Sequence, residues 1–356
     1  MNKQEILARL PQILPDWYRK NARPLPWRRD REPYHVWLSE IMLQQTRVEA
    51  VKGYYERFLQ RLPTIRDLAE AEPDTLTKLW EGLGYYSRVR NLQAAARQIQ
   101  TLHGGVFPDS YEKIRALQGI GDYTAGAIAS ICFELPTPAV DGNVLRIISR
   151  LMLDERDVLL PQVRKDVAAS LAPVYPEGQC GVFTQSLMEL GATVCLPNGA
   201  PRCESCPAAS VCKARQTGAW QRLPVKGKKA PRQVRELTVF VLRCDGKTAV
   251  RKRPHTGLLA GLWEFPNVEG KLSAEQALET ARAWGARPRD LEMVLERQHV
   301  FTHVVWQMRC FYIRCAKTPE GFTWASEDEL DERIALPTAF RMFRQAAQTE
   351  ETNSES

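Results

Sequence analysis

Four cysteines fall within 18 residues of one segment, CLPNGAPRCESCPAASVC. Cys195, Cys203, Cys206 and Cys212 follow the spacing C-x7-C-x2-C-x5-C. Four soft thiolates close together suit a tetrahedral zinc ion or a cubane iron–sulfur cluster, and four unrelated thiols would rarely lie so densely. Typical zinc sites pair two close couples across a long gap, whereas these ligands run along one short loop. The spacing therefore favours an iron–sulfur cluster and leaves zinc open.

Two carboxylates have sequence contexts that suit acid–base chemistry. Glu40 lies in the apolar run VWLSEIML (36–43), so a helix here would be largely buried. Burial raises the pKa of a carboxyl group, and a general acid must be protonated near neutral pH. Asp141 lies in PAVDGNVLR. Alternatively, Glu40 faces a polar groove or caps a neighbour, and Asp141 or Asn143 simply caps the helix that begins near Val144.

A glycine-rich turn, LQGIGDYTAGAI (117–128), precedes another apolar, helix-compatible run. Gly119 and Gly121 flank one isoleucine. Glycine costs order unless the backbone needs a special angle or must come close to another group. The turn is either a tight connection between helices or a place where backbone N–H groups bind a phosphate at a helix N-terminus.

The elements that position these residues form two domains of different character. Apolar spacing predicts helices over 34–46, 71–83, 87–103 and 110–117, and no convincing strand pattern precedes residue 230. We expect a helical domain over 1–217 and a basic linker over 218–232. An α+β domain follows over 233–347, with strands around a turn at Cys244-Asp245-Gly246, a strand region over 299–315 and a helix over 273–285. The polar tail, 348–356, is expected to be disordered.

The composition is that of an ordinary globular protein, with 44% hydrophobic and 26% charged residues among 356. The net charge of +7 suits a nucleic-acid partner without proving one. We see no secretory signal and no run long enough for a membrane span, which predicts a soluble, cytoplasmic protein.

The order of these motifs resembles the helix-hairpin-helix superfamily of base excision glycosylases. The expected helix-hairpin-helix, about 115–130, contains the glycine-rich turn and is followed by PAVDGNVLR and then by the four-cysteine loop, 195–212. The segments LPWR, WLSEIMLQQTRV and WEGLGYYSRVRNL resemble the adenine DNA glycosylase (MutY) family in particular. This resemblance implies a [4Fe–4S] cluster on the four cysteines, although the first spacing is one residue longer than the family's usual C-x6-C.

The resemblance also implies the reaction. Glu40 matches the family's glutamate that protonates adenine, Asp141 matches the aspartate that stabilises the sugar cation, and Asn143 supports Asp141. Tyr123 stands where related glycosylase-lyases carry a nucleophilic lysine, which tyrosine cannot replace in Schiff-base chemistry. The expected enzyme is therefore a monofunctional glycosylase that excises adenine mispaired with 8-oxoguanine or guanine.

Further positions match residues that surround the two bases. Around the extruded adenine these are Arg23, Leu25, Trp27, Arg28 and Gln185. Near the lesion and the DNA backbone they are Gln45, Thr46, Leu83, Tyr85, Gly119, Gly121 and Thr302.

The second domain resembles the Nudix fold, but its metal-binding box is missing, because LETARAWG (278–285) retains only Glu279. Hydrolase activity is therefore not expected, since carboxylates must hold the magnesium ion. The loop HVFTH (299–303) resembles the family's F-S-H loop for 8-oxoguanine, with Thr302 in place of serine.

The expected partner is double-stranded DNA with A·8-oxoguanine or A·G mispairs, bound by a monomer. Two alternatives are an oxidised-pyrimidine or mismatch-thymine glycosylase of the same superfamily, and a non-catalytic iron–sulfur DNA-binding protein.

Overall fold

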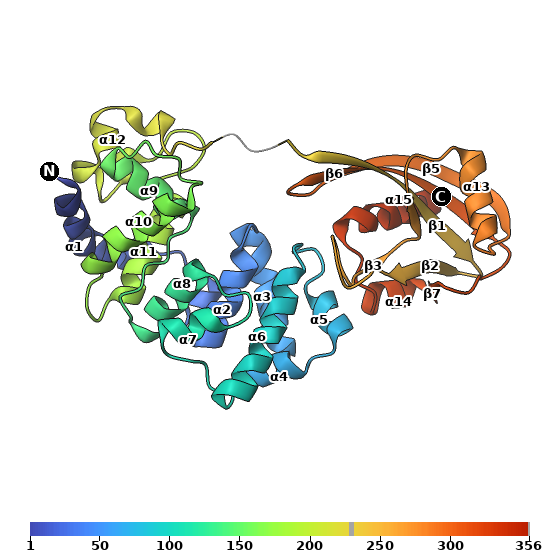
Figure 1. Cartoon of the computed structure of the whole chain (residues 1–356), viewed down its shortest axis with the longest axis horizontal. Coiled ribbons are helices and arrows are strands. Elements are labelled where there is room, and N and C mark those ends of the chain that lie inside the picture. Colours follow the sequence, from blue (N-terminus) through green and yellow to red (C-terminus); the bar gives the residue numbers. More distant parts are fainter. Residues whose placement is uncertain (228–230, 355–356) are drawn as a thin grey trace. The chain divides into compact units, whose positions relative to one another are not determined.

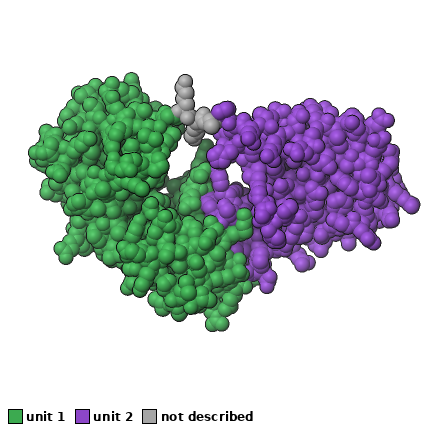
Figure 2. Space-filling view, in the orientation of Figure 1, with its two compact units in different colours: residues 1–70, 90–228 green, residues 71–89, 229–356 purple. Residues whose placement is uncertain are grey.

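The computed structural model describes residues 1–227 and 231–354, and it divides into two compact units (Figure 2). One unit comprises residues 1–70 and 90–228, and the other comprises residues 71–89 and 229–356. Within the described part of the chain, no helix is both long and apolar enough to cross a bilayer. Residues 228–230 of the predicted linker and 355–356 of the predicted tail lie outside the described residues.

The first unit is built from helices (Figure 1). They are α1 (Lys3–Asn21), η1 (Pro26–Arg28), α2 (Pro33–Leu43), α3 (Val48–Arg61), α4 (Ile65–Glu70), most of α6 (Ser87–His103), α7 (Tyr111–Ala116), α8 (Asp122–Phe133), α9 (Gly142–Met152), α10 (Pro161–Leu171), η2 (Ala172–Val174), α11 (Cys180–Thr193), η3 (Cys203–Ser205), η4 (Ala209–Val211), α12 (Lys213–Gln216) and η5 (Ala219–Arg222). The helices predicted over 34–46, 87–103 and 110–117 are present as α2, α6 and α7.

One hydrophobic core of this unit lies between α1, α9, α10 and α11. Leu10, Ile148, Leu171 and Phe183 contribute to it and are all almost completely buried. Helix α11 packs against α1, α8 and α9, and α2 packs against α8. This packing brings the N-termini of α8 and α9 near the middle of α2 and α11, which is where the predicted site residues lie.

The second unit contains a mixed sheet whose strand order is β3-β2-β1-β6-β5, with β4 paired to β1 and β7 to β2. Its elements are α5 (Pro73–Leu79), β1 (Gln233–Cys244), β2 (Lys247–Lys252), β3 (Trp263–Glu264), β4 (Asn267–Glu269), α13 (Ala274–Ala283), β5 (Pro288–Val300), β6 (Val304–Cys315), β7 (Thr323–Ala325), α14 (Glu327–Glu332) and α15 (Thr338–Ser354). Strands β1 and β6 are parallel, and β5 and β6 are antiparallel.

Alternation along β1 places side chains in two cores. Val239 and Val241 pack with Phe340 of α15, whereas Phe240 and Leu242 pack with Ala277 of α13. The helices α15 and α13 therefore cover opposite faces of the sheet (Figure 1). The strand region expected over 299–315 is two strands, because the turn at 301–303 separates β5 from β6. The backbone of α15 is helical to Ser354, across most of the segment that composition predicts to be disordered.

Residues 71–89 interrupt the helical half of the sequence but group with the sheet. The Lys78 ammonium group donates to the carbonyls of Leu330 and Ile334, at 3.2 Å each. A Glu81 carboxylate oxygen accepts the Leu336 backbone N–H at 2.9 Å. Hydrophobic periodicity assigns this segment to the helical domain, and it cannot reveal these long-range polar contacts.

Candidate active site

A cavity of about 670 Å³ in the helical unit gathers most of the predicted site residues. The segment before α2, the glycine turn, the N-terminus of α9 and one face of α11 contribute its lining. The predicted residues that line it are Arg23, Leu25, Trp27, Arg28, Glu40, Gln45, Thr46, Gly119, Gly121, Tyr123, Asp141, Asn143 and Gln185. Lining residues that the sequence did not indicate include Ser39, Gln44, Arg164 and Met188.

Glu40 presents a buried carboxyl group to this cavity from the middle of α2. Glu40 as a whole is 6% exposed, and the Tyr123 hydroxyl donates a hydrogen bond to Glu40 Oε2 at 2.7 Å. Burial raises the pKa of Glu40 to about 7, while the Tyr123 hydrogen bond and the Arg28 charge act in the opposite direction. A substantial fraction of Glu40 is therefore protonated at neutral pH, as a proton donor requires.

Asp141 both caps α9 and lines the cavity. Its Oδ1 accepts the Val144 backbone N–H at 2.8 Å, which confirms the capping alternative. Its Oδ2 accepts from the Asn143 amide at 2.8 Å. Burial raises the pKa of Asp141, and these hydrogen bonds oppose the rise because they favour the carboxylate. The cap thus fixes the carboxylate beside the cavity instead of excluding a chemical role.

A hydrogen-bonded path joins Asp141 to the cysteine loop. The Arg146 guanidinium donates to Asn143 Oδ1 at 2.9 Å and to the Cys195 carbonyl at 2.8 Å. Arg146 is itself 5% exposed. The loop that carries the cysteines therefore supports the residue that orients Asp141.

The two glycines of the turn differ in backbone conformation and in the space around them. Gly119 has φ +75°, and a Cβ there would lie 2.5 Å from the Cβ of Asn91. Gly121 caps α8 with an ordinary φ of −92°, and nothing lies within 4 Å of where its Cβ would be. Backbone geometry therefore requires Gly119, whereas Gly121 leaves the N-terminus of α8 uncovered beside the cavity.

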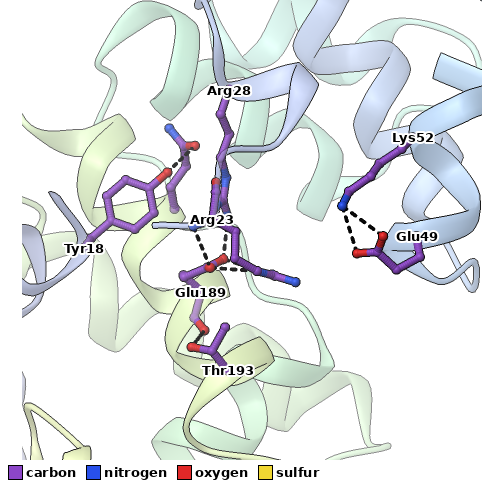
Figure 3. Close-up of polar contacts among 8 residues, drawn as sticks. Tyr18, Arg23, Arg28, Glu49, Lys52, Glu189 and Thr193 are labelled. Carbon is purple, nitrogen blue, oxygen red and sulfur yellow. Dashed lines mark hydrogen bonds and ion pairs between the residues drawn. The ribbon is translucent and has the colours of Figure 1, made fainter. Parts of the chain in front are cut away.

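One side of the cavity carries arginines that share a buried carboxylate. Figure 3 shows the side chains of Arg23 and Arg28 meeting Glu189 of α11. The Tyr18 hydroxyl donates to Gln185 Oε1 at 2.8 Å. Glu189 was not among the residues expected from the sequence, although the pattern that indicated Glu40, a carboxylate in an apolar helical run, is also present in FTQSLMEL (183–190).

The four predicted cysteine ligands line a second, small cavity of about 30 Å³ in the same unit. The Arg150 guanidinium donates to the Cys195 sulfur at 3.3 Å. Among the described residues, no three His, Cys, Asp or Glu side chains are arranged to hold a single metal ion. In a cubane cluster, iron and sulfide separate the cysteine sulfurs, so cysteines spread around one cavity fit such a cluster.

The remaining predicted residues, Leu83, Tyr85 and Thr302, belong to the second unit. Leu83 is buried, and Tyr85 is 47% exposed. The Tyr85 hydroxyl lies 2.8 Å from Thr302 Oγ1. Tyr85 has φ +47° and Gln45, in the first unit, has φ +59°. Left-handed backbone is unusual for such residues and often marks functional positions.

Family models and known proteins agree on both halves of the chain. Residues 38–173 match the HhH-GPD superfamily of base excision DNA repair proteins, and residues 238–346 match the NUDIX domain. Adenine DNA glycosylases of Rattus norvegicus and Homo sapiens are each 34% identical over 92% of this chain and over 76% and 72% of their own lengths. A thermostable thymine-DNA glycosylase structure aligns with a TM-score of 0.54 and 25% identity, over 60% of this chain and 97% of that one.

Proposed function

The chain belongs to the adenine DNA glycosylases, hydrolytic enzymes of base excision repair, and from that premise we propose that it excises adenine mispaired with 8-oxoguanine or guanine. The observation that carries the proposal is Glu40. A buried carboxyl group with a pKa of about 7 lies in the same cavity as Asp141. The expected product is an abasic site.

Glu40 acts in this proposal as the general acid. Adenine is a poor leaving group as an anion, and a proton delivered to its N7 lets it depart as a neutral base. The hydrogen bond from Tyr123 fixes the orientation of the Glu40 carboxyl group at 2.7 Å. Placement by such a bond matters because general acid catalysis requires the donor within hydrogen-bond reach of the acceptor.

Asp141 stabilises the sugar cation that forms as the base departs. Glycoside hydrolysis commonly uses one carboxyl group as the acid and a second beside the cationic carbon. The hydrogen bonds from Val144 and Asn143 hold the Asp141 carboxylate in place. Tyr123 cannot form a Schiff base with the opened sugar, so we propose that the enzyme has no lyase step.

The cavity lining suits a base that has left the DNA stack. A glycosidic bond inside the duplex is inaccessible, so the nucleotide must be extruded into a pocket. Leu25 and Trp27 supply apolar surface, while Arg23, Arg28 and Gln185 supply polar groups. The uncovered N-terminus of α8 after the glycine turn suits a DNA phosphate, because its N–H groups and dipole favour anions.

We assign recognition of 8-oxoguanine to the second unit, and we propose separately that Gln45 and Thr46 of the first unit contact the DNA near the mispair. The Thr302 hydroxyl can accept the N7–H that distinguishes 8-oxoguanine from guanine. Tyr85 contacts Thr302 and is exposed, so it is available to stack or wedge at the mispair. The partner is double-stranded DNA bound by a monomer, and we place the protein in the cytoplasm, associated with the nucleoid.

We further propose that Cys195, Cys203, Cys206 and Cys212 hold a [4Fe–4S] cluster. Their shared cavity and the nearby Arg150 support this ligand set. The cluster would fix the shape of a loop that presents basic residues to DNA. Replacement of Cys203 by serine should lower both bound iron and DNA affinity. Retention of four irons with full affinity would contradict the assignment.

The decisive experiment is strand cleavage after alkali treatment. Duplexes that contain A·8-oxoguanine, A·G, T·G or an oxidised pyrimidine are incubated with the protein and then heated in alkali. Cleavage at adenine in the first two substrates, and none before alkali, is expected. Cleavage without alkali, or at thymine or the oxidised pyrimidine, would favour the alternative glycosylases. No cleavage with intact DNA binding would favour a non-catalytic protein.

A further inference from the structure

Glu189 lies behind the arginine side of the adenine cavity. Gln185, Met188 and Ala192 of α11 line the cavity, and Glu189 is absent from that lining. The Glu189 side chain is 0% exposed. A carboxylate in such a place is costly unless it is paired and hydrogen-bonded, so its contacts show what it does.

Four N–H groups bind the two oxygens of Glu189. The Arg23 backbone N–H and Nε donate to Oε1 at 3.1 and 2.7 Å. Arg23 Nη2 and Arg28 Nη2 donate to Oε2 at 2.9 and 2.8 Å. One carboxylate thus grips Arg23 as a fork and holds Arg28 beside it (Figure 3).

Arg28 has two further contacts. Its Nη1 donates to the Arg23 carbonyl at 3.2 Å, and its guanidinium lies 5.3 Å from the Tyr18 ring centroid. Tyr18 in turn donates to Gln185. Glu189 is therefore at the centre of a network that joins α1, the segment before α2 and α11.

The charges of this network act on two carboxyl groups in opposite ways. Burial would raise the pKa of Glu189, but the hydrogen bonds from Arg23 and Arg28 outweigh it and lower that pKa, so Glu189 is an anion. At Glu40, burial raises the pKa, Asp141 adds to the rise, and Tyr123 and Arg28 oppose it. The position and charge of Arg28 therefore influence the pKa of Glu40, the proposed general acid.

We propose that Glu189 is a positioning residue that holds Arg23 and Arg28 along one wall of the adenine cavity. This inference rests on the proposed function. Glu189 does not touch the base; it fixes two cationic side chains that do. The negative charge of Glu189 also compensates part of the positive charge of both arginines. The charge of Glu49 of α3 has a weaker effect on Arg23. Glu49 is itself paired with Lys52 at 2.9 Å (Figure 3).

The test compares two buried carboxylates that each hold two arginines. Glu264 of β3 is 2% exposed and pairs with Arg251 at 2.9 Å and with Arg253. It lies in the second unit and serves as the matched control. Adenine excision is followed under single-turnover conditions from pH 5 to 9, for the wild type, Glu189→Gln and Glu264→Gln.

We expect Glu189→Gln to slow excision about tenfold, because misplaced binding groups cost rate. The pH at which activity is half lost on the alkaline side should rise by roughly 0.5 to 1 unit, because Arg28, whose charge lowers the pKa of Glu40, is no longer held in place. Glu264→Gln should leave this midpoint at the wild-type value. A Glu189→Gln midpoint equal to that of the wild type would overturn the proposal and reduce Glu189 to a structural pair.

Glu189→Asp supplies a second test should Glu189→Gln not fold. Aspartate keeps the charge but is one methylene shorter, so it cannot reach both arginines equally well. Its rate should fall, and its midpoint should rise less than that of Glu189→Gln because Arg28 keeps a carboxylate nearby. A wild-type rate would overturn the positioning role. The wild-type enzyme separates the two hypotheses: failure to excise adenine refutes the proposed function, whereas normal wild-type excision with unaffected variants refutes the inference alone.

Discussion

Two buried glutamates border one cavity, and their surroundings give them opposite properties. Glu40 receives one neutral hydrogen bond, from Tyr123, and burial raises its pKa to about 7. Glu189 receives four hydrogen bonds from two arginines, and its pKa is lowered. Burial alone therefore does not define an acid; the number and charge of the donors decide whether a buried carboxyl group keeps its proton.

The largest expected effect is loss of the acid itself. Glu40→Gln is nearly isosteric and removes only the transferable proton, so adenine excision should fall by about 100- to 10,000-fold while DNA binding remains. Glu189→Gln should cost far less. Single-turnover rates on A·8-oxoguanine duplexes measure both variants. Excision by Glu40→Gln within tenfold of the wild type would break the comparison.

Thermal stability should respond to the same two substitutions with opposite signs. Below about pH 4.5, Glu40 is neutral in both the folded and the unfolded protein. Because its pKa is raised to about 7 in the folded protein, the tendency of Glu40 to ionise lowers the free energy of unfolding as the pH rises from about 4.5 through about 7. At pH 8.5, Glu40→Gln should therefore be the more stable protein, by up to about 3 kcal/mol. Glu189→Gln leaves two arginines without their carboxylate and should lose about 3 kcal/mol.

Melting temperatures at pH 5 and pH 8.5 test this pair of signs. The advantage of Glu40→Gln should shrink at pH 5, where the wild-type carboxyl group is mostly protonated. Equal destabilisation by both substitutions at pH 8.5 would show that Glu40 is held as an anion, like Glu189.

A smaller change sharpens the role of the neutral donor. Tyr123→Phe removes the hydrogen bond that lowers the pKa of Glu40, so that pKa should rise. The alkaline loss of activity should then move to higher pH. The pH profile of single-turnover excision measures this shift, and a move to lower pH would contradict the assigned direction.

The smallest expected effect is at Thr302, which lies outside the cavity and offers a neutral hydroxyl group instead of a charged one. Thr302→Val keeps the side-chain shape and removes one hydrogen bond, worth about 0.5–1.5 kcal/mol. Preference for A·8-oxoguanine over A·G should therefore narrow by a few-fold to about tenfold. An unchanged ratio, with a large loss on deletion of residues 233–356, would place lesion recognition elsewhere in the second unit.

Local patterns in the sequence predicted much of the helical unit. Apolar periodicity located α2, α6 and α7, and the short motifs, together with the family resemblance that they carry, indicated residues that meet in one cavity. The role of Asp141 was ambiguous because the same local pattern is typical of a helix cap and of a catalytic carboxylate. In the structure, the Asp141 side chain caps α9 and also borders the cavity.

Contacts between residues far apart in the sequence could not be predicted, for a physical reason. The attachment of Lys78 and Glu81 to the sheet unit depends on backbone groups about 250 positions away, which no local pattern encodes. Glu189 has the same apolar helical context as Glu40, but its partners, Arg23 and Arg28, lie more than 160 positions away. Context could select both glutamates, whereas only their partners distinguish an acid from an anion.

The most direct test of the account is the pH dependence of adenine excision at enzyme concentrations well below saturation, which reports groups of the free enzyme. Activity should fall as the pH rises through about 7, the pKa of Glu40, and this transition should be absent from the residual activity of Glu40→Gln. Activity that stays constant or increases from pH 6 to 9, or the same transition in Glu40→Gln, would contradict the assignment of Glu40 as the acid.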